Sequence, residues 1–305
     1  MPSPKVTRRS SRPSSAPPKA EAPKGERVAK AIARAGVCSR REAERLIAEG
    51  RVVLDGTRLD SPAVNVAPDA RITIDGKPLP APAPAGLWRY HKPKGLITTA
   101  RDPQGRPTVF EALPPDLGRV LSIGRLDLNS EGLLLLTNDG ALKRRLELPA
   151  GGWIRRYRVR VQGRVEPAAL AGLAGGVTVS GVDYGPIQAE LERQSGSNAW
   201  LSLALAEGKN REVRHVLEHL GLAVNRLIRV AYGPFQLGHL ERGQVEAVPA
   251  EVLRERLGIG AGGGRKTGFA KAKPRPPKPG ARKAKSGRTG RDKAGAKHAH
   301  RRRTT

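Results

Sequence analysis

The sequence of 305 residues contains a single cysteine, Cys38, and aromatic residues make up only 3% of it. One cysteine excludes an internal disulfide and any zinc site built from several cysteines, and we interpret Cys38 as a small buried residue. No apolar run approaches the roughly 18 residues of a membrane-spanning helix. The first residues are basic but lack the apolar segment of a secretory signal. These absences predict a cytoplasmic protein without a membrane partner.

Acidic residues are also scarce, with 28 Asp and Glu against 56 Lys and Arg and a formal net charge of +28. Charge of this size indicates a polyanionic partner, and nucleic acid is a better candidate than a membrane surface. Much of the excess lies at the ends, because residues 259–305 contain 16 Lys and Arg against one acid. We expect two disordered basic tails, residues 1–24 and 259–305, that contact RNA phosphates without reading sequence.

Residues 25–78 have the pattern of a small folded module. Apolar residues at helical spacing precede Gly36, and Ser39-Arg40-Arg41-Glu42 has the form of a capping box that opens a second helix. Short strands end in Asp-Gly turns at residues 55–56 and 75–76. The arginines on and after the second helix form either a solvated helix face or an RNA-binding surface; these candidates are Arg40, Arg41, Arg45 and Arg51.

A Pro/Ala linker, residues 79–86, separates this module from a larger domain, residues 87–258. Periodicity predicts helices over residues 140–147, 167–174, 211–220 and 249–257. It predicts strands over residues 88–90, 121–123, 133–136, 157–161, 177–179, 188–191 and 200–205. Strands outnumber helices and hairpin spacings recur, which favours an α+β fold with a mostly antiparallel mixed sheet over a doubly wound fold.

The stretch GRLDLNSEGLLLLTNDG, residues 124–140, places Asp127 in a polar loop directly before an apolar strand. A rigid strand fixes what its loop presents, so this is a suitable place for a reacting group, although an Asx-turn or helix cap is a commoner role for a loop aspartate. Two further loops, residues 91–95 and 101–108, carry Lys92, Lys94 and Arg106. These residues are candidates for contacts with an RNA backbone, or belong to ordinary loops.

Two resemblances join these features. Residues 27–56 resemble the S4 RNA-binding domain, and the stretch 124–140 is similar to the catalytic motif of the pseudouridine synthases of the RsuA/RluB family. RRYRV at residues 155–159 and EGKNREVRH at residues 207–215 resemble the second and third motifs of that family, in the same order. The likeness covers about residues 25–258. It implies an S4-type module followed by a pseudouridine synthase domain, which isomerises uridine in ribosomal RNA.

The resemblance also implies roles for individual residues. Asp127 is the catalytic carboxylate, Tyr157 lies against the target base, and Lys209 is the basic residue that pairs with Asp127. Arg214 is an alternative partner of Asp127 or a phosphate contact, and Arg211 is an RNA contact. Arg125 is a candidate to bind the phosphate of the flipped nucleotide or to fill the space that this nucleotide vacates. The carboxylate acts either as a nucleophile or as a base, and both routes require its ionised form.

The reaction neither oxidises its substrate nor consumes an energy carrier, so we expect no cofactor and no metal, in line with the lack of a P-loop or a cluster of metal-ligand residues in the sequence. The branch of the family that acts on large-subunit 23S rRNA is the most similar one at residues 105–110 and 153–157 and at the Arg211-Glu212 pair. Small-subunit 16S rRNA is the alternative substrate. We expect a monomer that acts on rRNA, free or within a ribosome assembly intermediate. The competing hypothesis is a non-catalytic rRNA-binding or ribosome-assembly factor, and only Asp127, Tyr157 and Lys209 distinguish the two.

Overall fold

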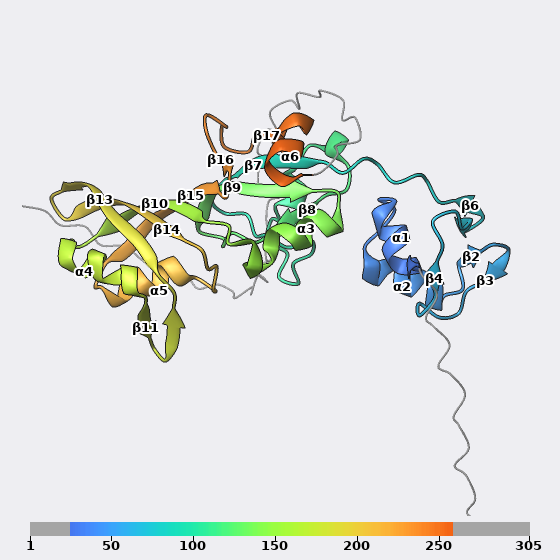
Figure 1. Ribbon diagram of the computed structural model, residues 1–305, viewed down its shortest axis with the longest axis horizontal. Helices are drawn as coiled ribbons and strands as arrows, with labels where there is room; N and C mark the ends of the chain where they lie inside the picture. Colours follow the sequence, from blue (N-terminus) through green and yellow to red (C-terminus); the bar gives the residue numbers. More distant parts are fainter. Residues whose placement is uncertain (1–24, 259–305) are drawn as a thin grey trace, which may run out of the picture. The chain divides into compact units, whose positions relative to one another are not determined.

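The structure is a computed structural model that describes residues 25–258, so the two predicted disordered tails lie outside the described residues. Residues 26–78 form an N-terminal module in which two helices and a small antiparallel sheet share one hydrophobic core (Figure 1). The helices are α1 (Val28–Arg34) and α2 (Arg40–Ala48). The four-stranded sheet has the order β3-β2-β5-β6, and a separate pair joins β1 to β4. The strands are β1 (Glu26–Arg27), β2 (Val52–Leu54), β3 (Thr57–Arg58), β4 (Asn65–Val66), β5 (Ile72–Ile74) and β6 (Lys77–Pro78).

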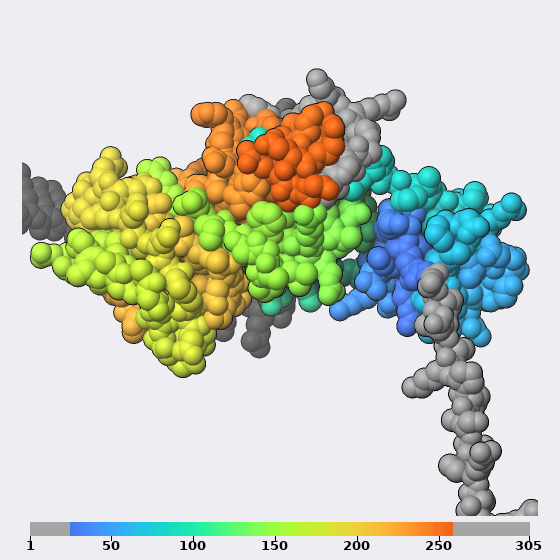
Figure 2. Space-filling view, viewed as in Figure 1, coloured from blue at the N-terminus to red at the C-terminus, as the bar shows by residue number. Residues whose placement is uncertain are grey.

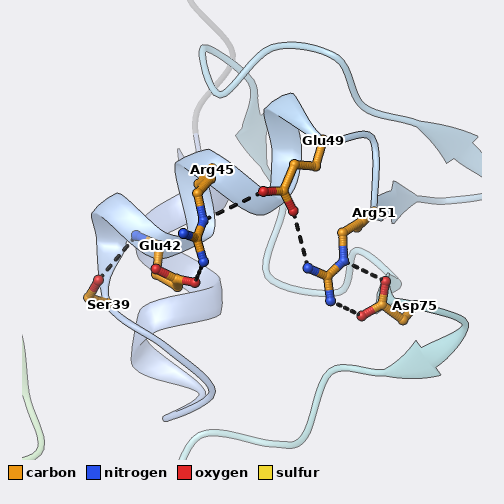
Figure 3. A network of polar contacts seen from close by, with 6 residues as sticks. All are labelled: Ser39, Glu42, Arg45, Glu49, Arg51 and Asp75. Carbon is orange, nitrogen blue, oxygen red and sulfur yellow. Dashed lines mark hydrogen bonds and ion pairs between the residues drawn. The ribbon is translucent and has the colours of Figure 1, made fainter.

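Helix α2 begins with half of the expected capping box. The Ser39 hydroxyl accepts a hydrogen bond from the Glu42 backbone N–H at 3.1 Å. The carboxylate of Glu42 pairs with Arg45 instead of returning to Ser39 (Figure 3). Such a cap satisfies one of the free N–H groups of the first helical turn, which is why the helix starts at this point.

Residues 87–257 are built on a nine-stranded sheet with the order β13-β14-β10-β15-β9-β7-β17, in which β16 pairs with β15 and β8 with β9 (Figure 1). Every pairing is antiparallel except that of β15 with β9. The α+β fold with a mostly antiparallel mixed sheet is therefore confirmed. The strands are β7 (Leu87–Lys92), β8 (Leu121–Ile123), β9 (Ser130–Thr137), β10 (Arg155–Gln162), β13 (Ile187–Ser195), β14 (Asn198–Leu205), β15 (Ala223–Tyr232), β16 (Phe235–Gln236) and β17 (Val245–Ala247).

The strand at the centre of this sheet, β15, was not predicted from the sequence. Its apolar residues do not alternate regularly, because Arg226 and Arg229 interrupt them and because the register with β10 shifts twice. A register shift turns neighbouring side chains to the opposite face, which removes the period of two that identifies a strand. The strands β16 and β17 were not predicted because they are too short to show a periodic pattern.

Four helices and one hairpin complete this part of the chain: α3 (Gly140–Glu147), α4 (Pro167–Gly172), α5 (Glu212–His219), α6 (Ala250–Leu257) and β11 (Val177–Val179) with β12 (Val182–Tyr184). The helix predicted over residues 140–147 has the bounds of α3, and the other three predictions agree within two residues. Four short 3-10 turns also occur: η1 (Phe110–Ala112), η2 (Pro115–Leu117), η3 (Pro149–Gly151) and η4 (Leu173–Gly175). None of the helices in residues 25–258 is long and apolar enough to cross a membrane.

The helices divide the sheet into two halves with separate cores. Helices α4 and α5 pack on the half that contains β10, β13 and β14. Helices α3 and α6 pack together on the other half, where the orange α6 lies against the green segment in Figure 2. Strand β9 runs between cores on both faces of the sheet, and all eight of its residues are buried. Burial on both faces explains why residues 133–136 are four consecutive leucines instead of an alternating pattern.

Gly132 permits the parallel contact between β9 and β15. Its φ is +103°, and a Cβ added there would lie 2.3 Å from the backbone oxygen of Arg229. Gly140, at the start of α3, has open space around its Cα and no positive φ. Strands β9 and β15 can therefore approach closely enough to pair only because β9 lacks a side chain at this position.

We predict that Gly132→Ala lowers the free energy of unfolding by about 2 kcal/mol or more, because the new methyl group meets backbone in a conformation that L-residues avoid. The matched substitution Gly140→Ala should be neutral or slightly stabilising. Chemical denaturation of both variants measures the difference, and equal stability of the two would contradict this account of Gly132.

Candidate active site

A cavity of about 620 Å³ lies beside the loop that connects β8 to β9. Its lining includes five residues singled out in the sequence, namely Arg125, Asp127, Tyr157, Lys209 and Arg211. They come from the β8–β9 loop, from β10 and from the segment that leads into α5. The fold thus collects the three resembling motifs around one space, although they are far apart in the sequence.

Backbone and hydroxyl contacts fix the loop that carries Asp127. The N–H of Gly95 donates to the carbonyl of Leu128 at 2.8 Å. The Thr98 hydroxyl donates to the carbonyl of Leu126 at 2.8 Å and accepts from its N–H at 3.2 Å. A side chain held in this way has little freedom to move away from a reacting atom. The polar loop is therefore rigid on both sides of Asp127.

Lys92 also holds this loop, from inside the protein. Its predicted role as an RNA-binding residue is therefore wrong. The side chain is fully buried. Its ammonium donates to the carbonyls of Ser130 at 2.8 Å, Asp127 at 3.0 Å and Pro93 at 3.1 Å. Burial lowers the pKa of Lys92 to about 8, although the negative charges of Asp127 and Glu131 act in the opposite direction. Lys92 is a buried cation that supports the Asp127 loop from within.

Arg214 supports the same loop from α5. It is 7% exposed, and its guanidinium donates to the carbonyls of Asn129 at 3.0 Å and Val224 at 3.2 Å. Burial and the neighbouring Arg211 lower the pKa of Arg214, whereas the negative charge of Asp127 raises it. Of the two roles considered for Arg214, the position beside Asp127 agrees with the structure. A direct phosphate contact does not, because the side chain is buried behind the cavity wall.

Lys209 lines the cavity, but its ammonium is bonded elsewhere. It donates to the carbonyl of Asp183 at 2.5 Å, pairs with the Glu207 carboxylate at 2.9 Å and lies 5.8 Å from the centre of the Tyr184 ring. The hydrogen bond to Glu207 raises the pKa of Lys209. The expected ion pair between Lys209 and Asp127 is not formed. Within residues 25–258, the Asp127 carboxylate has no hydrogen bond or ion pair.

Tyr157 is half-buried on β10 and forms part of the cavity wall. In the sheet it lies opposite Leu203 of β14 and Arg229 of β15. Side chains directly opposite one another on adjacent strands have Cβ atoms about 5 Å apart, so Tyr157 and Arg229 are neighbours. The ring of Tyr157 is thus fixed by the sheet on both sides.

Five charged lining residues were not singled out in the sequence: Lys143, Glu147, Arg155, Glu212 and Arg229. Lys143 is paired with Glu147 of the same helix. Glu212 is 3% exposed, one of its oxygens has no partner among the described residues, and burial raises its pKa. Arg229 is 3% exposed. The only sequence signal for Arg229 is a lone basic residue within an apolar stretch, which gains meaning only once β15 is recognised as a strand.

The remaining predicted RNA-binding residues lie outside this cavity. Lys94 is exposed and has no hydrogen bond or ion pair within the described part of the chain. Arg106 is bonded to Asp102 at 2.8 Å. In the N-terminal module, Arg45 and Arg51 belong to a network with Glu42, Glu49 and Asp75 (Figure 3). Arg40 and Arg41 are exposed and form no ion pair with an acid of residues 25–258.

The cavity has the chemistry of a site with one free carboxylate among cations. Its lining carries six basic residues and three acidic ones. Two of the acids are committed, because Glu147 pairs with Lys143 and Glu212 accepts the Lys209 N–H at 2.9 Å. Residues 25–258 contain no cluster of three or more histidine, cysteine, aspartate or glutamate side chains placed to hold a metal. Asp127 is the carboxylate available to a substrate.

Comparisons with known proteins agree with this arrangement. The family model for RNA pseudouridylate synthase matches residues 86–219, and that for the S4 domain matches residues 26–78. An uncharacterized RNA pseudouridine synthase of Rickettsia prowazekii (strain Madrid E) is 46% identical over 231 residues, which cover 76% of this chain and 97% of that protein. Ribosomal large subunit pseudouridine synthase B of Escherichia coli (strain K12) is 42% identical over 244 residues, with 75% of this chain and 82% of that protein covered.

One solved structure, described as a crystal structure of pseudouridylate synthase, is 26% identical, covers 75% of this chain and 99% of its own chain, and superposes with a TM-score of 0.53. Membership of one family thus explains the resemblance of the motifs, the S4-type module and the cavity around Asp127. The chain belongs to the RNA pseudouridine synthases that carry an N-terminal S4 domain.

Proposed function

We propose that the protein converts a uridine of large-subunit 23S rRNA into pseudouridine and that Asp127 is its catalytic residue. The observation that carries the proposal is the Asp127 carboxylate, which has no partner among residues 25–258 and lies on a hydrogen-bonded loop at the cavity wall. In the reaction the C1′–N1 bond breaks, the uracil turns, a C1′–C5 bond forms, and the proton of C5 is lost while N1 gains one. The product has the composition of the substrate, so the residues of the chain suffice.

Asp127 acts in its ionised form, as a nucleophile towards the ribose or base or as a base towards a ribose proton. Two buried cations, Lys92 and Arg214, stabilise that negative charge without neutralising it through a direct bond. Charges separated by a buried loop interact more strongly than in water. Lys209 was expected to support the charge of Asp127, and we assign that role to Arg214 and Lys92. We place Lys209 at the rim of the cavity.

Tyr157 holds the detached uracil and supplies a hydroxyl near the C5 proton. Arg125, exposed at the cavity, occupies the space of the flipped nucleotide or binds its phosphate. Flipping costs a few kcal/mol, and least in an unpaired loop. Arg211 at the entrance to α5 and Lys94 are further RNA contacts.

The large subunit is proposed because synthase B of Escherichia coli, whose name states that substrate, is 42% identical over most of both chains. We retain the division into an S4 domain (25–78), a linker (79–86) and a catalytic domain (87–258). In the S4 domain Arg40 and Arg41 are the foremost RNA contacts, because they have no acidic partner to exchange for a phosphate. We propose a cytoplasmic monomer that acts on rRNA, free or within an assembly intermediate.

The first prediction concerns Asp127 itself. Asp127→Asn should abolish release of tritium from 5-tritiated uridine in undermodified 23S rRNA, because the amide is neither a nucleophile nor a base. Asp116→Asn, an exposed aspartate of η2, is the matched control and should keep the wild-type rate.

The outcomes separate the hypotheses. Equal release by the wild type and Asp127→Asn would refute the assignment of Asp127. Release from 16S rRNA alone would move the substrate to the small subunit, and no release from either rRNA would favour the non-catalytic binding factor.

The second prediction compares the two basic residues of the third motif. Arg214→Met should lower kcat by about 100-fold, the size expected when an electrostatic group of the transition state is removed. Lys209→Met should change kcat by less than about threefold, because its charge is already paired with Glu207. Single-turnover rates at saturating RNA measure both. The reverse order of the two effects would restore Lys209 as the partner of Asp127.

The third prediction concerns pH. Lys92 is protonated below its pKa of about 8 and loses its charge as the pH rises through that value. The rate of the wild type should therefore fall above about pH 8, since neutral Lys92 no longer stabilises the Asp127 loop. Lys92→Met should be about 100-fold slower at pH 7, a loss typical of misplaced catalytic groups, and should lack this limb. A limb near pH 8 that persists in a folded Lys92→Met enzyme would contradict the role of Lys92.

A further inference from the structure

Arg229 is a buried cation that forms no ion pair with an acid of residues 25–258. It is 3% exposed, and its Nε donates a hydrogen bond to the carbonyl of Leu133 at 2.8 Å. Its Nη2 is buried with no hydrogen bond to the described residues, and the side chain lines the cavity. A guanidinium that loses its water without gaining partners costs several kcal/mol. Arg229 therefore lines the cavity with donor capacity that the described residues do not use.

Arg155 is a second arginine of the cavity wall, but it is only half-buried. Its guanidinium donates to the carbonyl of Trp153 and the hydroxyl of Tyr232, both at 3.1 Å, and to the carbonyl of Ala206. No carboxylate within residues 25–258 pairs with it. Arg155 also lines the cavity and stands at the start of β10.

Both guanidinium groups lie against the ring of Tyr232. The distance from the ring centre to Cζ is 4.9 Å for Arg155 and 5.3 Å for Arg229. Cation–π contacts and carbonyl bonds orient the two groups, but neither contact removes their positive charge. Lys92 is a further positive charge, buried like Arg229, and it is close by, since Arg229 contributes to lowering the pKa of Lys92. Like charges at this depth repel one another, and an anion between them relieves the repulsion.

We propose that Arg229 and Arg155, held against Tyr232, form a subsite for a phosphodiester group of the RNA strand whose uridine enters the cavity. The proposal rests on the proposed function for the identity of the ligand. A phosphodiester offers two charged oxygens, and arginine binds such groups through paired N–H donors. Arg229 stands opposite Tyr157 in the sheet, so the phosphate would be held beside the ring assigned to the base.

The test uses the full-length chain with Asp127→Asn, so that binding to an undermodified 23S rRNA fragment is measured without turnover. Arg229→Met should weaken binding by at least tenfold, the usual worth of a charged hydrogen bond. It should also reduce the slope of log K against log salt by about 0.7 to 0.9, the contribution of one phosphate contact. Arg158→Met is the matched control, because Arg158 is an exposed arginine of β10 already paired with Glu192; it should leave the slope unchanged.

A second measurement separates phosphate binding from a structural role. Uridine, uridine 5′-monophosphate and uridine 3′-monophosphate are compared as competitors of the RNA fragment. In the parent protein one monophosphate should bind at least tenfold more tightly than uridine, and this preference should disappear in Arg229→Met and partly return in Arg229→Lys. Equal losses for all three competitors, with an unchanged salt slope, would show that Arg229 only joins β15 to β9 and would overturn the subsite.

These readouts do not depend on catalysis. A reduced slope together with absent tritium release would retain the subsite and refute the enzymatic proposal. Tritium release by the wild type together with an unchanged slope would refute the subsite alone.

Discussion

The centre of this protein depends on buried positive charge that backbone carbonyls satisfy. Lys92 and Arg214 have lost nearly all contact with water, and each recovers hydrogen bonds only from carbonyl oxygens, most of them in residues 127–130. A buried charge without partners is too costly to keep, so the loop must adopt the conformation that presents those oxygens. The position of Asp127 follows from this requirement. Within residues 25–258 the carboxylate remains unbonded, while the two buried cations donate to the carbonyls of its loop.

The same excess of positive charge explains the character of the cavity. Arg155 and Arg229 face it without acidic partners, and the acids that line it are few and mostly committed. A site of this composition suits a ligand that carries a negative charge next to the neutral group that reacts. A uridine within an RNA strand has both. At the surface of the N-terminal module, Arg45 and Arg51 pair with acids in a network (Figure 3). Arg40 and Arg41 are exposed there and pair with no acid of the described residues.

The sequence predicted those elements whose signals are local. Helix α3 has the predicted bounds because local signals enclose it: Asp139 caps it, accepting from the N–H groups of Ala141 and Leu142, and four consecutive leucines lie in the strand before it. The three motifs were sufficient to place Asp127 and Tyr157 at one cavity. What failed depends on long-range geometry. Strand β15 was not predicted because its arginines and two register shifts break the alternating pattern. Arg229, which lies on this strand, was therefore not recognised as a residue of the site.

Motif position also did not decide between neighbouring basic residues. Lys209 and Arg214 are both in the third motif, but Lys209 precedes α5 and turns to Glu207, whereas Arg214 lies on the buried face of the helix. Lys92 was read as a loop residue because it is followed by proline. It is instead the last residue of β7, and its side chain points into the protein.

The parallel pairing of β9 with β15 has a consequence for biosynthesis. Leu227 pairs with Ser130, so β9 is made well before the strand that completes the first part of its edge. At a translation rate of about 5 to 20 residues per second, this interval lasts roughly 5 to 20 seconds. During that time the backbone N–H and C=O groups of residues 130–132 form an unpaired strand edge. That short edge of the nascent chain stays open until the strand that carries Arg229 has been made.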